Sequence, residues 1–253
     1  RHRAQGSRGY RGGWGRCNRK GVSALSAIRH PANRETPLRR RIWFLGDSLT
    51  AGYDASSAQN TFVALFRQAY AGDHPSFVYH SANLYGGRIS DGLRQAKAEA
   101  SFNPDVAVLQ FGENDRPWTT GFREAYQGLI LELYRAGRHP LVAAFSVWDP
   151  SGNDSAKMDP DIRELVAEAG GVFVDISQAA AEPAHRQAGR DVSWLNDPQH
   201  LTSDSFHPND AGHDRMAEVL LAALKEILKS PVARDTASGR VRVSGRPRIQ
   251  EAR

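Results

Sequence analysis

The sequence predicts an α/β fold in which a five-stranded parallel sheet is covered by helices on both faces. Two observations predict it. Short apolar runs alternate with segments of helical periodicity between residues 42 and 229, which is typical of βαβ units. The run Val106–Phe111 is apolar almost throughout, as expected for a central strand that is buried on both faces. We therefore expect one three-layer α/β/α domain.

The predicted elements follow from these two kinds of pattern. Five apolar runs are predicted strands: Ile42–Leu45, Phe77–Tyr79, Val106–Phe111, Leu141–Phe145 and Val172–Val174. About five helices are expected, and four segments show helical spacing of apolar residues: Thr61–Tyr70, Phe122–Arg135, Asp161–Ala169 and Ala211–Leu228. The segment Ser177–Ser203 lacks periodicity and contains two prolines, so we expect a long loop there, beside the C-terminal edge of the sheet.

The net charge of +5 is unevenly distributed along the chain. Residues 1–41 contain twelve Lys or Arg and one acidic residue, and residues 230–253 contain six Arg and two acidic residues. The body between them is therefore net acidic. The basic residues of both ends lie among Gly, Ser and Pro, which bury too little apolar surface to offset chain entropy. We expect disordered tails at 1–38 and 230–253 around a domain at 39–229.

This distribution and the cysteine count exclude several function classes. A nucleic-acid-binding domain carries its Lys and Arg on the folded surface, so we expect no specific nucleic-acid partner. The single cysteine, Cys17, excludes an internal disulfide framework and a thiolate metal cluster. No apolar run approaches the roughly 18–20 residues that span a bilayer. The N-terminal residues show no apolar core of a secretory signal, and the cellular location is not indicated.

A candidate nucleophile follows the first predicted strand. Ser48 lies in Gly46-Asp47-Ser48-Leu49, just past Ile42–Leu45. In open α/β sheets, ligands bind at the carboxyl ends of the strands, which is where this serine falls. A serine before a helix is also a common N-cap, so this motif alone does not separate the two roles.

A candidate base lies near the C-terminus of the domain. His207 is followed by Pro208, which favours a loop at the entrance of the next helix. Asp204, three residues earlier, can hydrogen-bond one nitrogen of the imidazole and fix its tautomer. The nearest competing histidines are His200 and His213, and the latter falls within the predicted last helix. A capping or packing role is the alternative for His207.

Two further motifs offer hydrogen-bond donors at strand ends. Asn114 lies in Gly-Glu-Asn-Asp, directly after Val106–Phe111, and its amide can stabilise the oxyanion that forms in acyl transfer. The pair Gly86-Gly87 follows the second predicted strand, and a glycine allows a backbone N–H to approach an intermediate closely. Each motif is also an ordinary turn sequence.

Together these motifs resemble a known family. The blocks GDSLTAGY, NLYGGRIS, FGEND and DSFHPND occur in the order and at the separations of the SGNH hydrolases, also called the GDSL esterase/lipase family. The resemblance spans about residues 42–225 and implies the flavodoxin-like fold of that family. No Gly-x-Ser-x-Gly motif is present, which argues against the α/β-hydrolase fold.

The resemblance also implies roles for the residues of the four blocks. Ser48 would be the nucleophile, His207 the base and Asp204 its orienting acid. The oxyanion hole would combine the N–H of Ser48, the N–H of a glycine in the second block and the side-chain amide of Asn114. We favour Gly87 because a Gly-Arg pair begins this block in the family, but neither glycine is followed by the family's usual residues. No metal or organic cofactor is implied.

The expected reaction is hydrolysis of a carboxylic ester. Family members act on short-chain esters, acetylated sugars, thioesters or lysophospholipids. No long insertion suggests a lid, so we expect small esters or acetyl groups on carbohydrate. The alternatives are a lysophospholipase or thioesterase of the same family and a non-catalytic ligand-binding relative. Trp118 follows Asn114 closely and is expected either at the rim of the site or packed on the domain.

Overall fold

The computed structural model describes residues 40–71, 77–115, 121–135, 139–186 and 204–229, together with two short strands at 233–234 and 241–242. All of them belong to one compact unit, Leu38–Arg253. The N-terminal tail expected for residues 1–38 lies outside the described residues, as does most of the expected C-terminal tail.

The central sheet has five parallel strands, as predicted, and their order is β2-β1-β3-β4-β5. The strands are β1 (Arg41–Gly46), β2 (Val78–Asn83), β3 (Val106–Gln110), β4 (Leu141–Phe145) and β5 (Val172–Val174). This is the flavodoxin-like order, in which the chain reverses direction across the sheet between β2 and β3. Because the strands are parallel, the turns that follow β1, β2 and β3 meet at one edge of the sheet.

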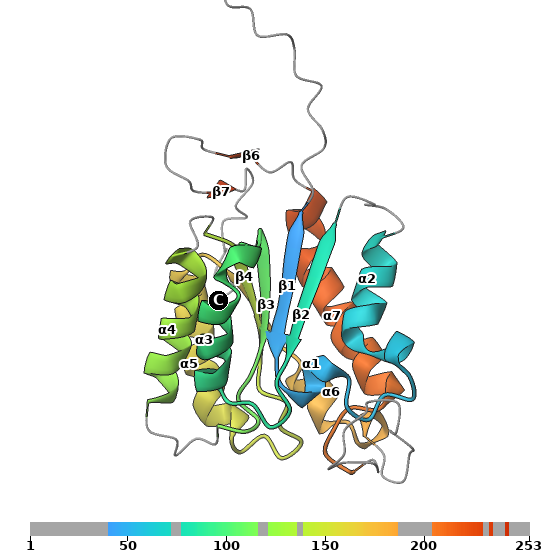
Figure 1. Ribbon diagram of the computed structural model, residues 1–253. Coiled ribbons are helices and arrows are strands. Elements are labelled where there is room, and N and C mark those ends of the chain that lie inside the picture. The colour runs from blue at the N-terminus through green and yellow to red at the C-terminus, as the bar shows by residue number, and fades with distance from the viewer. Residues whose placement is uncertain are drawn as a thin grey trace, which may run out of the picture. The chain divides into compact units, whose positions relative to one another are not determined.

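The helices form a layer on each face of the sheet (Figure 1). One layer consists of α2 (Phe62–Ala71) and α7 (Asp210–Lys229), and the other of α3 (Ile89–Ala98), α4 (Phe122–Arg135) and α5 (Ser155–Glu168). Alternate residues of β1 face opposite layers: Phe44 packs into the core with α2 and α7, and Leu45 packs into the core with α3 and α4.

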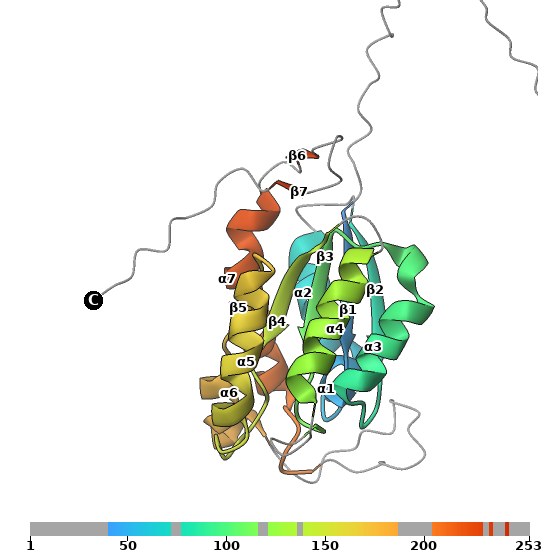
Figure 2. The same cartoon turned by 90° about the vertical axis from the view of Figure 1, so that its left-hand side faces the viewer.

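The carboxyl edge of the sheet carries two short helices. These are α1 (Ser48–Ala51), directly after β1, and α6 (Ser177–Ala181), soon after β5. Both views place them at the lower end of the sheet (Figures 1 and 2). Chemistry-bearing residues that follow the strands are thereby gathered at this edge.

One helix begins earlier than the sequence predicts. The spacing indicated a helix from Asp161, whereas α5 begins at Ser155 and contains Pro160. The carboxylate of Asp149 accepts the N–H groups of Asp154 and Ser155 at 2.7 and 3.1 Å, which fixes the start of α5 ahead of the proline. Proline disfavours a helix locally, but α5 begins ahead of it, at these local hydrogen bonds.

The expectation of an unstructured loop over Ser177–Ser203 is wrong at its start. Ser177–Ala181 forms α6, and Pro183–His185 forms a 3₁₀ turn. The Asp175 carboxylate accepts both the N–H and the hydroxyl of Ser177, which stabilises the first turn of α6. Two elements this short carry too few residues for a periodicity to be recognised. Residues 187–203 lie outside the described residues.

A two-stranded antiparallel pair lies within the segment expected to be the C-terminal tail. It consists of β6 (Ala233–Arg234) and β7 (Val241–Arg242). The pair makes no ladder with the central sheet.

Candidate active site

The turn after β1 presents Ser48 at the carboxyl edge of the sheet. Ser48 is the first residue of α1, and its exposed fraction is 8%. The helix is capped by Asp47, whose carboxylate accepts the N–H of Leu49 at 3.0 Å. The capping role that a serine often takes therefore belongs to Asp47, and the Ser48 hydroxyl has a different partner.

The turn after β1 lies so close to β3 that only glycine fits at position 46, the residue just before the turn. A Cβ at Gly46 would lie 2.0 Å from Oγ1 of Thr50 and 2.7 Å from the carbonyl oxygen of Gln110. A side chain here would push α1 away from β3. The glycine of the Gly-Asp-Ser-Leu motif is thus required for the position of Ser48.

Ser48, His207 and Asp204 form a continuous hydrogen-bonded chain. The Oγ of Ser48 lies 2.9 Å from Nε2 of His207, and Nδ1 of His207 lies 2.7 Å from Oδ2 of Asp204. Burial alone would raise the pKa of Asp204, but its hydrogen bonds with His207 and Phe206 lower it to about 2. The carboxylate is therefore ionised at neutral pH, so that Nδ1 donates to it and Nε2 is free to accept the Ser48 proton.

The loop that carries His207 is held from several sides. The other carboxylate oxygen of Asp204 accepts the N–H groups of Phe206 and His207, both at 2.8 Å. The indole N–H of Trp148 donates to the carbonyl oxygen of Phe206 at 2.7 Å. The ring of Tyr53 packs against the His207 ring with their centroids 4.3 Å apart. Tyr53 and Trp148 were not identified from the sequence, because a single aromatic residue carries no signal of which loop it supports.

Asn114 joins the ends of three strands. Its Nδ2 donates to Oδ2 of Asp47 at 3.0 Å and to the carbonyl oxygen of Gly87 at 3.1 Å. Asp47 follows β1, Gly87 follows β2 and Asn114 follows β3, so the amide of Asn114 bonds to residues that follow the other two strands.

The two glycines of the second block differ in their backbone environment. Gly86 has a φ of +64°, which favours glycine, whereas Gly87 is buried and its N–H donates to the carbonyl oxygen of Leu84 at 2.7 Å. The N–H of Gly87 therefore already has an acceptor within the turn.

Behind Ser48 lies a buried polar network that the sequence did not indicate. The Oε1 of Gln110 accepts the N–H and the hydroxyl of Thr50 at 3.2 and 2.9 Å, and its Nε2 donates to Glu113 at 2.8 Å. The other carboxyl oxygen of Glu113 accepts the N–H of Trp148 at 2.7 Å. Both residues lie in or beside the FGEND block, but a glutamine in an apolar strand gives no clue to its partners.

The sequence offered His200 and His213 as alternatives to His207 for the base, and the structure describes only His213. His213 is buried within α7, where its Nε2 donates to the carbonyl oxygen of Tyr53 at 3.1 Å and its Nδ1 accepts the N–H of Phe62 at 3.3 Å. Burial lowers the pKa of His213 to about 4, so it is a neutral packing histidine. His200 lies outside the described residues, as does Trp118.

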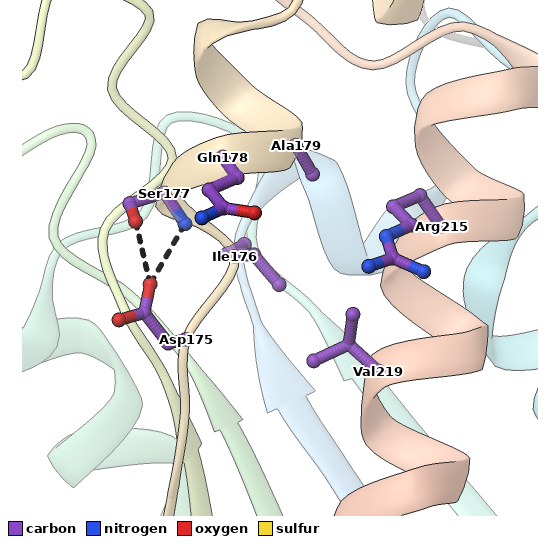
Figure 3. Close-up of a pocket in the computed structure, with 7 residues that line it drawn as sticks. All are labelled: Asp175, Ile176, Ser177, Gln178, Ala179, Arg215 and Val219. Atoms are coloured by element: carbon purple, nitrogen blue, oxygen red, sulfur yellow. Dashed lines mark hydrogen bonds between the residues drawn. The ribbon is translucent and has the colours of Figure 1, made fainter.

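In the part of the chain that the structure describes, neither a metal site nor a surface pocket competes with this arrangement. Among the residues that the structure describes, no group of His, Cys, Asp and Glu is arranged to hold a metal ion. A pocket of about 270 Å³ lies between the start of α6 and α7. Its lining contains none of the residues of the four blocks, and Figure 3 shows Gln178 and Arg215 at its two sides. None of the described helices is long and apolar enough to cross a membrane.

Comparison with known proteins gives a match to a protein-family model. The model of the GDSL-like Lipase/Acylhydrolase family matches residues 44–215, which include all four blocks. Comparison with curated protein sequences found no match.

Solved structures also resemble the chain. The psychrotrophic esterase EstA from Pseudoalteromonas sp. has 17% identity and a TM-score of 0.59 over 76% of this chain and 100% of its own. A two-domain esterase active on acetylated mannans has 23% identity and a TM-score of 0.60 over 76% of this chain and 50% of its own. An acetyl xylan esterase, AlAXEase, has 22% identity and a TM-score of 0.52 over 73% and 99%. At these identities the likeness confirms the predicted fold.

Proposed function

Since the chain belongs to the GDSL-like lipase/acylhydrolase family, we propose that it is a serine esterase that hydrolyses short-chain esters, or acetyl groups on carbohydrate, through an acyl-enzyme on Ser48. Family membership confirms the predicted class, a carboxylic ester hydrolase. The observation that most supports the mechanism is the hydrogen-bonded chain from the Ser48 hydroxyl through His207 to the ionised Asp204.

Acylation begins with the proton of the Ser48 hydroxyl. As Oγ attacks the ester carbonyl carbon, Nε2 of His207 takes this proton, and the Asp204 carboxylate stabilises the resulting imidazolium. The imidazolium then gives the proton to the leaving alcohol oxygen as the C–O bond breaks. The product of this step is an ester of Ser48 and a released alcohol.

The negative charge on the carbonyl oxygen is stabilised by donors at the carboxyl edge of the sheet. The N–H of Ser48, the amide of Asn114 and a backbone N–H of the Gly86-Gly87 turn are the proposed donors. Both hydrogens of Asn114 Nδ2 have acceptors, so binding of the oxyanion replaces the bond to the Gly87 carbonyl. In the same way, Gly87 can act only if its N–H leaves Leu84, which makes Gly86 an equal candidate.

Deacylation repeats the same chemistry with water. Nε2 of His207 accepts a proton from a water molecule as its oxygen attacks the acyl carbon. Return of that proton to Ser48 Oγ releases the carboxylic acid and restores the enzyme.

The substrate class is inferred from the neighbours and from the exposed edge of the site. Two of the similar structures are an esterase active on acetylated mannans and an acetyl xylan esterase. Tyr85, in the loop that carries the Gly86-Gly87 pair, has an exposed fraction of 44%, and we propose that its ring contacts the sugar.

The test is a hydrolysis screen with wild type and Ser48→Ala. We expect activity on p-nitrophenyl acetate and on acetylated xylan or mannan oligosaccharides, falling as the acyl chain lengthens. Ser48→Ala should lower kcat by about 10⁴-fold or more, because the nucleophile is lost. An ethyl phosphonate that carries a p-nitrophenyl leaving group should add one phosphonyl group to wild type, with release of p-nitrophenol, and none to the variant; EstA is inhibited by monoethylphosphonate.

Undiminished hydrolysis by Ser48→Ala would contradict catalysis at this site. A preference for long acyl chains or acyl thioesters would instead favour a lysophospholipase or thioesterase. Binding of sugar esters without turnover by wild type would favour the non-catalytic alternative.

A further inference from the structure

The loop that carries the proposed base makes several hydrogen bonds within itself. One carboxylate oxygen of Asp204 accepts the N–H groups of Phe206 and His207, and the other lies 2.7 Å from Nδ1 of His207. Because these contacts join residues two or three positions apart, they would be kept if the loop moved as a unit. They orient the imidazole, but its distance from the Ser48 hydroxyl depends on contacts between the loop and other segments.

Trp148, shortly after β4, makes such a contact. Its buried indole N–H donates to the carbonyl oxygen of Phe206 at 2.7 Å. This carbonyl and the N–H of His207 belong to the same planar peptide group. Trp148 therefore bonds one end of the peptide group that precedes the imidazole, and Asp204 bonds its other end.

The backbone of Trp148 is tied to α1, the helix that begins with the proposed nucleophile. The N–H of Trp148 donates to one carboxyl oxygen of Glu113 at 2.7 Å, and the other oxygen accepts Nε2 of Gln110 at 2.8 Å. Oε1 of Gln110 in turn accepts the N–H and the hydroxyl of Thr50, which lies in α1. The buried polar network behind the proposed nucleophile is thus continuous with the loop of the proposed base.

This network crosses three neighbouring strands at the carboxyl edge of the sheet. Helix α1 follows β1, Gln110 ends β3 and Trp148 follows β4, and these strands are adjacent in the order β1-β3-β4. Thr50, Gln110, Glu113 and Trp148 are all buried. The loss of a buried donor leaves its acceptor without water to replace it, which makes each bond costly to break. The network therefore gives the loop a fixed position relative to the sheet.

Other contacts of the loop do not replace the bond from the indole. The N–H and the side-chain amide of Asn209 donate to carbonyl oxygens of the turn Pro183–His185 at 2.8 and 2.9 Å, which holds the chain after the proposed base. The ring of Tyr53 packs against the imidazole, and an apolar contact of this kind has little directionality. Neither contact bonds the peptide group between Phe206 and His207.

We propose that Trp148 is a positioning residue, which sets the distance between His207 and Ser48 by joining the loop to the buried polar network. This inference rests on the proposed esterase function. Without the indole N–H, the carbonyl of Phe206 loses its partner and the loop can shift as a unit. Nε2 of His207 would then leave hydrogen-bond distance of Ser48 Oγ, which is 2.9 Å in the structure, while its bond to Asp204 would be kept. Proton transfer from the nucleophile depends on the first of these bonds.

The kinetic test compares Trp148→Phe with Trp43→Phe on p-nitrophenyl acetate. Both changes remove a buried indole N–H and keep an aromatic ring, since the exposed fractions of Trp148 and Trp43 are 0% and 1%. The difference is that Nε1 of Trp43 has no hydrogen-bond partner among the described residues. We expect Trp148→Phe to lower kcat by about 10- to 100-fold with KM changed less than about threefold, because the substrate still binds. Trp43→Phe should leave both within about twofold of wild type.

Proton NMR tests whether the loop moves as a unit. The hydrogen between Nδ1 of His207 and the Asp204 carboxylate is strongly deshielded, because the bond is short and involves a charged acceptor. We expect its downfield signal in wild type, Ser48→Ala and Trp148→Phe, and its loss in Asp204→Ala, which assigns the signal. Retention of the signal together with the fall in kcat would show that the imidazole keeps its orienting acid and has shifted from Ser48.

The outcomes separate this inference from the proposed function. Unchanged kcat in Trp148→Phe would overturn the inference, as would equal falls in Trp148→Phe and Trp43→Phe, or loss of the downfield signal in Trp148→Phe. If Trp148→Phe does not fold, Thr50→Val decides, because it removes the hydroxyl donor at the other end of the network. We then expect kcat to fall by about threefold or more with the downfield signal kept, and unchanged kcat would again overturn the inference. If instead Ser48→Ala keeps its activity, the proposed function fails, whatever these variants do.

Discussion

Two histidines near the start of α7 differ in their roles because different groups surround their rings. His207 lies in a loop with one nitrogen on Asp204 and the other on the Ser48 hydroxyl. His213 is completely buried, and both of its nitrogens are bonded to backbone groups. It also holds the backbone of Tyr53, whose ring packs on His207. A structural histidine thus supports the proposed base through Tyr53.

We expect His213 to make the free energy of unfolding depend on pH. Its pKa is lowered by burial to about 4, while an unfolded histidine has a pKa of about 6.5. Between these values only the unfolded chain binds the proton, so stability falls as the pH falls from about 6.5 to 4. The contribution of this one residue is about 3 kcal/mol over that window.

Urea unfolding of wild type and His213→Gln over this pH range is the measurement. The variant should be less stable near neutral pH, and the difference should shrink as the pH falls. Asp115 and Asp159, with pKa values raised to about 6, act in the opposite direction, but they are common to both proteins and cancel. A difference that does not change with pH would contradict a buried neutral His213.

The elements show where prediction from the sequence succeeds and where it stops. Four strands were predicted nearly to their ends because each is an apolar run, and β1 and β3 are buried along nearly their whole length. The run Phe77–Tyr79 marked only the first residues of β2, because the rest of that strand is mostly polar. Helix α3 was not identified, since it buries only Ile89, Gly92 and Ala96. Gly92 is small because a Cβ there would lie 2.6 Å from the Phe111 ring, a contact that no sequence pattern reveals.

The same limit applies to the site. The sequence placed Ser48, Asn114, Asp204 and His207 at strand ends or loops, and the structure brings them to one edge of the sheet. It did not reveal that Asn114 reaches Asp47, nor that Gln110 bonds both Thr50 and Glu113. Residue type and order along the chain point to the groups that we propose to react, whereas their supporting hydrogen bonds depend on packing between distant segments.

The loop between β2 and α3 is expected to select the substrate. Tyr85 lies in this loop, close to the glycine whose carbonyl holds Asn114. We expect Tyr85→Ala to raise KM for acetylated xylan or mannan oligosaccharides by about three- to tenfold, the effect of one aromatic contact. The kcat for p-nitrophenyl acetate, which lacks a sugar, should be unchanged.

Leu131→Ala is the matched control, because Leu131 is an exposed apolar side chain on α4, with an exposed fraction of 56%. Equal effects of both changes on KM, or no effect of Tyr85→Ala, would exclude a sugar contact at Tyr85.

At the scale of the whole molecule, the excess of basic residues lies outside the proposed catalytic domain. Residues 42–229 are net acidic, and the excess of basic residues lies before and after them. The sequence pI of about 9.5 is therefore a property of the ends. Attraction to polyanions, if it is carried by these ends, should be independent of ester hydrolysis.

We expect a chain trimmed to residues 38–230 to keep kcat and KM for p-nitrophenyl acetate within about twofold of the full chain, since the four blocks and both helix layers remain. The full chain should bind a heparin column at low salt and elute as the salt rises, because its basic ends are attracted to the sulfates. The trimmed chain has lost most of its Arg and Lys excess, so it should pass through. Loss of hydrolysis together with heparin binding would show that the ends and the domain are not separable, whereas retention of heparin binding would place the basic surface on the domain itself.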